Sequence, residues 1–228
     1  MQKNVLFILY IMLFTSLACN AISNIPGLST PASDDSKKIL YQDDFSDTST
    51  GWTQLTDADG ITDYYDGGYR IRVDTIGSEG NGMDVWARPG QNLEGDIIVE
   101  VDATRIDGPD SNDMGVLCRY TKDDDGNFSF YYFLITSDGY VGIAKMNKSE
   151  SDMISGEDMT ESDAIKRNDT NHIRADCVGK NLTLYVNGKK VASATDSDFT
   201  GGDIGLIAGT FEETGVDIKF DNFVVTAP

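Results

Sequence analysis

The sequence predicts an all-β domain, a sandwich of two antiparallel sheets, over residues 39–228. Three observations support this fold class. Apolar and polar residues alternate with a period of two in many short runs, which is typical of strands with one buried face. Turn sequences recur about every 8 to 15 residues, and no apolar stripe with helical spacing reaches a useful length. A domain of this length can bury a real core.

The first 19 residues predict an export signal that ends in a lipid-attachment site. Lys3 supplies the positive start, and residues 5–14 form an apolar run too short for a membrane span, which needs about 20 residues. Residues 16–19, Ser-Leu-Ala-Cys, resemble the lipobox of bacterial lipoproteins, in which the cysteine is lipid-modified. Ser16 departs from the aliphatic residue that this family prefers. We expect lipidation at Cys19, with ordinary signal cleavage nearby as the alternative.

Residues 20–38 predict a flexible linker, because they are rich in Ser, Pro, Asn, Gly and Asp and poor in large apolar residues. Such a stretch cannot bury enough surface to fold. It would tether the domain at a distance from a membrane or wall. We therefore expect an exported protein, held at the outer face of the cell membrane by its lipid or else secreted.

The net charge of the chain limits the classes of partner that we expect it to bind. The 228 residues include 38 acidic and 18 basic ones, a formal net charge of -20. Such a surface repels phosphate backbones, so nucleic acid is not expected as a partner, whereas solubility and divalent cations are favoured. The single histidine, His172, argues against many acid–base mechanisms.

The domain is expected to open with a strand at 40–45 and to close with a strand at 216–225 that pairs with it. In the closing strand, Val216, Ile218, Phe220, Asn222 and Val224 are expected on one face. Between these ends we expect strands at 69–73, 97–106, 114–120, 128–136, 140–146, 172–178, 182–186, 189–194 and 204–208.

Two connections between these strands stand out. Asn187-Gly188 is the strongest turn signal, because both residues tolerate the positive φ of a tight hairpin. Residues 147–167 form a long polar segment, expected to be a loop with a helical turn. The sequence leaves open whether this segment covers a sheet.

The order of several motifs resembles a concanavalin A-like lectin/glucanase jelly roll over residues 40–228. These motifs are Asp-Asp-Phe-Ser-Asp (43–47), Trp52, Asp-Gly-Gly-Tyr-Arg-Ile (66–71), Gly-Val-Leu-Cys-Arg (115–119), Leu-Tyr-Val-Asn-Gly (184–188), Gly-Asp-Ile-Gly-Leu (202–206) and Phe-Asp-Asn-Phe-Val-Val (220–225). Within this fold, the chain is most similar to the 3-keto-disaccharide hydrolase group and to laminin-G-like modules. The resemblance implies two antiparallel sheets and a concave front face that often meets sugars, but no single activity.

The same resemblance implies a structural calcium ion. In related glucanases, the ligands are an acidic residue of the opening strand, a backbone carbonyl near the following turn and an aspartate of the closing strand. The matching positions here are Asp44, Gly68 and Asp221. A hard cation prefers several oxygen ligands, and this one would join both ends of the domain. The alternative is that both aspartates are solvated residues at strand edges.

A sugar-binding front face is expected near residues 128–133, Phe-Ser-Phe-Tyr-Tyr-Phe, which place aromatic rings on both faces of one strand. One face can enter the core, and the other needs a cover or a ligand. Aromatic rings stack on the C–H faces of sugars, and arginine supplies fixed donors. The candidate ligand-binding residues are Arg119, Tyr132, Trp52 and Trp86. The alternative is that residues 147–167 cover the second aromatic face.

Two cysteines remain if Cys19 carries a lipid. Cys177 shares the apolar face of its strand, and Cys118 is expected to point inward as well, which would turn Arg119 outward. Two cysteines in the core of an exported protein favour a disulfide between strands. Two unpaired core thiols are the alternative, and the sequence leaves both open.

The glucanase motif Glu-x-Asp-x-x-Glu is incomplete in this chain. The nearest run is Glu100-Val-Asp102-Ala-Thr-Arg105, so a retaining pair of carboxylates is not supplied by this motif. The sequence therefore favours a non-catalytic module that binds carbohydrate or another cell-surface ligand. One alternative is a hydrolase of 3-keto-disaccharides, with Arg119 and nearby acids in a deep pocket. Another is a structural envelope or adhesion protein.

Overall fold

The computed structural model describes residues 37–77 and 82–228, which contain strands and turns but no helix. Accordingly, no helix that could cross a membrane occurs in these residues. The expected export signal, the lipid site at Cys19 and nearly all of the linker lie outside the described residues.

The strands follow one another closely along the chain. They are β1 (Ile39–Asp43), β2 (Leu55–Thr56), β3 (Gly60–Tyr65), β4 (Gly68–Val73), β5 (Met83–Ala87), β6 (Leu93–Glu94), β7 (Ile97–Asp107), β8 (Asp113–Lys122), β9 (Phe128–Thr136), β10 (Tyr140–Asn147), β11 (Glu150–Met153), β12 (Thr160–Glu161), β13 (Asn171–Val178), β14 (Asn181–Val186), β15 (Lys189–Thr195), β16 (Gly201–Thr210) and β17 (Val216–Thr226).

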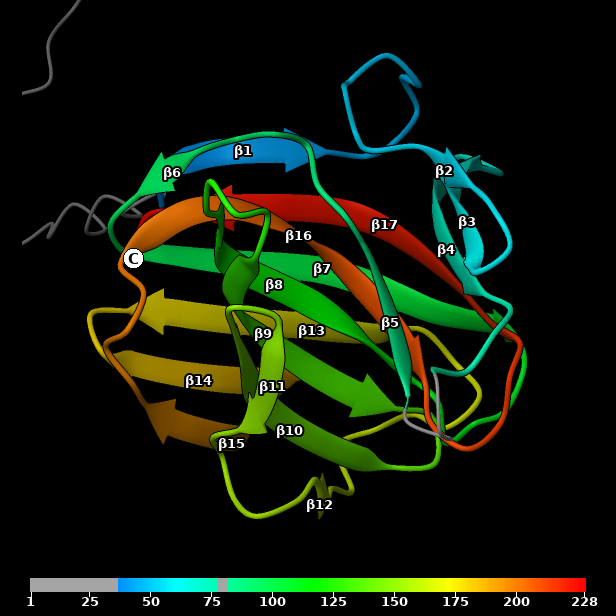
Figure 1. Cartoon of the computed structure of the whole chain (residues 1–228). Helices are drawn as coiled ribbons and strands as arrows, with labels where there is room; N and C mark the ends of the chain where they lie inside the picture. Colours follow the sequence, from blue (N-terminus) through cyan, green and yellow to red (C-terminus); the bar gives the residue numbers. More distant parts are fainter. Residues whose placement is uncertain (1–36, 78–81) are drawn as a thin grey trace, which may run out of the picture. The chain divides into compact units, whose positions relative to one another are not determined.

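Two antiparallel sheets form the sandwich (Figure 1). Sheet A has nine strands in the order β15-β14-β13-β7-β17-β4-β3-β2, with β1 also paired to β17. Sheet B has eight strands in the order β11-β10-β9-β8-β16-β5, with β12 on β10 and β6 on β16. The two-sheet antiparallel prediction is confirmed. The tight turn at Asn187-Gly188 joins β14 to β15, with φ values of 50° and 82°.

The first and last strands lie side by side, as the sequence predicts. Asp43 of β1 is opposite Phe223 of β17, and β17 pairs with β7 on its other edge. Figure 1 shows β1 in blue beside β17 in red. The closing strand therefore holds both ends of the domain in one sheet.

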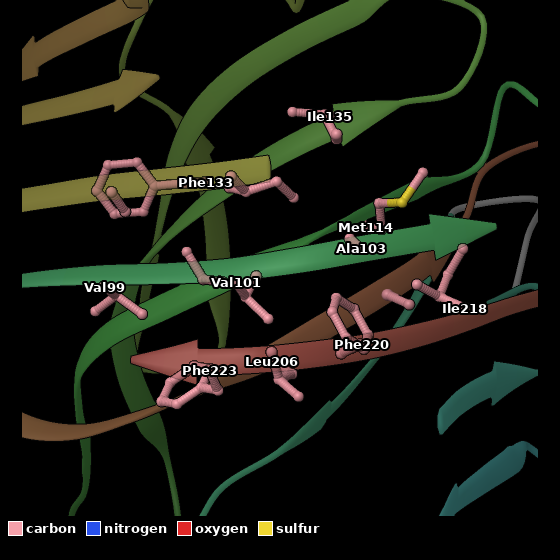
Figure 2. Packing of buried hydrophobic residues seen from close by; sticks show 14 of the residues in the cluster. Val99, Val101, Ala103, Met114, Phe133, Ile135, Leu206, Ile218, Phe220 and Phe223 are labelled. Atoms are coloured by element: carbon pink, nitrogen blue, oxygen red, sulfur yellow. The ribbon is translucent and has the colours of Figure 1, made fainter. Parts of the chain in front are cut away.

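The core lies between the two sheets (Figure 2). Alternate residues of each strand enter it, because side chains of a strand point to opposite faces in turn. Sheet A contributes Val99, Val101, Ala103, Ile218, Phe220 and Phe223, and sheet B contributes Met114, Phe133, Ile135 and Leu206. Burying a Val, Leu, Ile, Phe or Met side chain stabilises the fold by about 1.5–3 kcal/mol.

A bulge in β17 corrects the predicted alternation of the closing strand. Asn222 has a φ of 54°, and the register with β7 shifts between Asp221 and Val224. Two residues thus occupy the space of one, so Phe223 enters the core and Asn222 is exposed. The prediction that Val216, Asn222 and Val224 share one face is therefore wrong for the residues after Phe220.

A second bulge, in β8, corrects the position of Arg119. This residue has a φ of 58°, and the register with β9 shifts between Cys118 and Thr121. Arg119 is 2% exposed and points into the interior, whereas Tyr120 takes the outward position. Its guanidinium donates to the backbone carbonyls of Gly179 (2.9 Å), Phe199 (2.9 Å) and Cys177 (3.0 Å). Arg119 is thus part of the interior, and its predicted place on the front face is wrong.

The structure joins Cys118 and Cys177 in a disulfide. Cys118 lies on β8 of sheet B and Cys177 on β13 of sheet A, so the bond connects the two sheets through the core. It resolves the choice between a disulfide and two free thiols.

The segment 147–167 contains β11, β12 and turns, and not the expected helical turn. It folds over the outer face of sheet B. A side chain at Gly142 of β10 would meet Met153 and Met159 of this segment at 3.1 Å. The segment therefore covers part of the second aromatic face, which is the alternative that the sequence left open.

The disulfide gives a first prediction. Its two cysteines are 59 residues apart, and closing a loop of that length stabilises a fold by about 4 kcal/mol in the chain-entropy model. The double variant Cys118→Ser/Cys177→Ser should lose free energy of unfolding of about that size in urea titrations. Reductant should destabilise the wild type and leave the variant unchanged. An equal response of both proteins to reductant would contradict the bond.

Candidate functional site

The outer face of sheet B carries a second apolar cluster, separate from the core. Its buried members are Leu117, Tyr120, Phe130, Tyr132, Leu134, Ala144, Met146 and Ile207, with Trp86, Phe128, Met153 and Met159 packed against them. Strand β9 explains its origin, since Phe130 and Tyr132 point outward while Tyr131 and Phe133 enter the core. Most of this cluster is buried, so any ligand would meet it through the partly exposed residues at its margin.

The aromatic rings gather at one end of this face. The ring centroids of Trp86 and Phe128 are 4.7 Å apart, and those of Trp86 and Phe130 are 5.4 Å apart. Tyr120 stacks on Phe130 at 5.6 Å. Trp86 and Phe128 are partly exposed. The row thus offers ring surface to a ligand.

Polar groups stand beside this row. The guanidinium carbon of Arg88 lies 3.7 Å from the ring centroid of Tyr120, and its Nη1 donates to Asp203 Oδ2 at 2.9 Å. Burial raises the pKa of Asp203, and the charge of Arg88 opposes that shift. We call the adjoining cavity of about 420 Å³ the aromatic groove; its lining includes Arg88, Asn92, Tyr120, Thr121, Lys122 and Asp203.

Two of the predicted ligand residues lie near this site and two do not. Trp86 is in the aromatic row, and Tyr132 lies on the same face but is 3% exposed and bonded through its hydroxyl to Ser151. Trp52 packs in the core, where its indole N–H donates to Asp43 at 2.9 Å, so its predicted exposure on the front face is wrong. Arg119 is interior, as described above.

Sequence reasoning missed Arg88, Tyr120 and Asp203. Arg88 follows Trp86 by two positions, and the period of two could have placed both on one face. Tyr120 reaches that face only through the β8 bulge, which the sequence does not reveal. Asp203 comes from β16, opposite Tyr120, and only the strand pairing brings it there.

The expected calcium ligands come from neighbouring stretches of sheet A. Strand β1 ends with Asp43 opposite Phe223 of β17, and Tyr69 near the start of β4 is opposite Phe220. The Asp44 carboxylate already accepts two hydrogen bonds from Ser46, and a methyl group on Gly68 would meet Lys219 Cε at 2.6 Å. Within residues 37–77 and 82–228, no three Asp, Glu, His or Cys residues are arranged to hold a metal. The predicted set, two carboxylates and one backbone carbonyl, is smaller than such a group, and calcium at Asp44, Gly68 and Asp221 stays a prediction.

Asp84 and Asp113 form an unexpected pair at the other end of the outer face of sheet B. Val85 and Met114, their neighbours in sequence, enter the core, so both aspartates point outward. Both are opposite Gly209 of β16, one from each side. A methyl group at Gly209 would overlap Asp84 Oδ1 and lie 3.0 Å from Asp113 Oδ1, so the carboxyl groups converge above the glycine.

Burial changes the titration of this pair. It raises the pKa of the Asp84 carboxyl to about 6. Burial and, after it, the charge of Asp84 raise the pKa of Asp113 well above its usual range. Both shifts favour the protonated form of each carboxyl group in the absence of a cation.

The raised pKa values predict a stability that falls as pH rises. An aspartate whose pKa is higher in the folded state stabilises the fold below its unfolded pKa, near 4, and loses that contribution as pH passes its folded pKa. In chelator-containing buffer, the free energy of unfolding of the wild type should fall more steeply than that of Asp113→Asn as pH rises from about 5 to 8. Urea unfolding across this pH range would measure the difference between the two proteins. Parallel pH profiles of their stability would contradict the prediction.

No family model matches the sequence, and no curated protein matches it. The fold is similar to that of carbohydrate-binding module CBM66 from Bacillus subtilis, with a TM-score of 0.59 and 20% identity over 78% of this chain and 96% of the module. A β-glucanase from Bacillus licheniformis has a TM-score of 0.61 and 12% identity over 82% of this chain and 98% of its own.

A third structure, from Bacillus subtilis, is described as a protein of unknown function with a galectin-like fold. It has a TM-score of 0.60 and 11% identity over 83% of this chain and 96% of its own. All three neighbours are concanavalin A-like jelly rolls. At these identities the likeness establishes architecture, and together with the two sheets described above it confirms the predicted fold: the described part of this chain is a concanavalin A-like jelly roll.

Proposed function

We propose that this protein binds carbohydrate on the outer face of sheet B, in the aromatic groove. The observation that carries the proposal is the Arg88–Asp203 ion pair held against the ring of Tyr120, beside the partly exposed rings of Trp86 and Phe128. Aromatic surface beside fixed hydrogen-bonding groups is the arrangement that suits a sugar ring with its hydroxyls.

Trp86, beside the groove, and three residues that line the groove have roles in this proposal. The partly exposed ring of Trp86 would stack on the C–H face of a sugar. Arg88 would donate to hydroxyl oxygens with the N–H groups that Asp203 leaves free, because a guanidinium has five donors. Asp203 and Asn92 would accept or donate at neighbouring hydroxyls.

Two of the structural neighbours support the ligand class. One is a carbohydrate-binding module and the other a β-glucanase. The hydrolase alternative loses the residue on which it depended, since Arg119 is buried. Glu100 and Asp102 of the incomplete glucanase motif lie on sheet A, near His172, rather than on the aromatic face.

Carbohydrate binding can be tested with a matched pair of arginine variants. Arg88 lies over Tyr120 and pairs with Asp203, while Arg174 of sheet A lies over Tyr185 and pairs with Asp176. In calorimetric titrations with a panel of oligosaccharides, Arg88→Ala should weaken the binding of the sugars that bind wild type by about tenfold or more, because charged hydrogen bonds contribute about 1.5–3 kcal/mol. Arg174→Ala should bind as wild type does.

Two results would contradict the proposal. One is that no sugar of a broad panel binds the wild type, which would favour a structural role in the envelope. The other is that both arginine variants bind equally well. Circular dichroism of each variant would show that the fold is intact.

We also propose that the chain is exported and anchored by a lipid on Cys19, on the evidence of residues 1–19. In a bacterial host fed labelled palmitate, the wild type should incorporate label and sediment with membranes. Cys19→Ser should do neither. Label on the Cys19→Ser variant would contradict the anchor.

A further inference from the structure

The Asp84–Asp113 pair lies apart from the aromatic groove and has no role in the proposed sugar binding. Asp84 of β5 and Asp113 of β8 are brought together by β16, whose Gly209 separates them. Because Gly209 has no side chain, the oxygens of both carboxyl groups occupy the space above it. A cluster of acidic oxygens around one point is the arrangement that a hard cation needs.

No basic side chain of the described residues compensates the negative charge of this pair. Asp113 is 1% exposed, and its Oδ1 has no hydrogen-bond partner. In the described residues, no Lys, Arg or His lies within salt-bridge distance of either aspartate, although eleven such bridges form elsewhere. A buried carboxylate without a partner destabilises a fold by several kcal/mol, so native structures rarely retain one without a proton or a cationic ligand.

Access to the pair is through Asp84, which is only partly buried, whereas Asp113 forms the floor. An ion could therefore enter from solvent and reach the buried oxygen. The net charge of -20 raises the local concentration of cations around the whole protein.

We propose that Asp84 and Asp113 bind a divalent cation of the Ca²⁺ class between their carboxylates. The two aspartates supply the negative ligands, and water completes the shell on the open side. The unpartnered Oδ1 of Asp113 is the ligand that fixes the position of the ion. This site is separate from the sequence-predicted one, which is on sheet A at Asp44, Gly68 and Asp221.

Terbium luminescence tests the site on the full-length protein. Tb³⁺ replaces Ca²⁺ at oxygen sites and emits when a nearby indole is excited. Trp86 is on the same face as Asp84, two residues along β5, which corresponds to about 7 Å between Cα atoms. The wild type should show sensitised emission that saturates with Tb³⁺ and is removed by excess Ca²⁺.

Three isosteric variants locate the signal. Asp113→Asn and Asp84→Asn should each weaken the apparent Tb³⁺ affinity by about tenfold or more, because each removes a charged ligand. Asp44→Asn, the matched control at the sheet A site, should bind Tb³⁺ with an apparent affinity within about twofold of that of the wild type. Excess Ca²⁺ should raise the melting temperature of wild type and of Asp44→Asn, and of neither pair variant.

The proposal fails if the wild type shows no saturable emission, because the pair then shares only a proton. It also fails if both pair variants keep the wild-type emission, or if Asp44→Asn alone removes it. Should Asp113→Asn unfold, Asp84→Asn decides the outcome, since Asp84 is partly exposed. Sugar binding at the aromatic groove is measured separately, so failure of one proposal leaves the other standing.

Discussion

The architecture depends on β17, the strand that closes the chain. It pairs with β7 along one edge and with β4 and then β1 along the other, so this last strand joins the first strand to the middle of sheet A. Its inward residues Phe220 and Phe223 fill the centre of the core. Pairing between β1 and β17 fixes the positions of both ends of the domain. The disulfide links sheet A to sheet B.

Two single-residue bulges decide what the two sheets present to solvent. At Asn222 the extra residue lets Phe223 and Val225 enter the core in place of Asn222 and Val224. At Arg119 it sends a guanidinium inward, where three backbone carbonyls accept its hydrogen bonds, and frees Tyr120 for the outer face. A bulge shifts the side-chain alternation of a strand by one position, so one residue changes the chemistry of a whole face.

The outer face of sheet B combines two kinds of chemistry. Aromatic rings, with the Arg88–Asp203 pair beside them, occupy one end, and the Asp84–Asp113 pair occupies the other. Segment 147–167 covers part of the surface near Gly142 with two methionines. The two ends differ in how much they destabilise the fold. Exposed aromatic rings are common on protein surfaces, whereas burying a carboxylate without a partner costs free energy.

The sequence by itself determined the fold class, most strand positions and the turn at Asn187-Gly188, because these follow from local alternation and turn chemistry. The expected pairing of the chain ends is confirmed, but only the structure gives its register. It also placed Trp86 among the candidates for the outer face. Tertiary structure alone decided the rest of the site. Arg88, Tyr120 and Asp203 meet through a bulge and the pairing of distant strands, and Asp84 meets Asp113 only across Gly209, more than 90 residues away along the chain. Register between distant strands is set by the packing of the whole core, which no local pattern records.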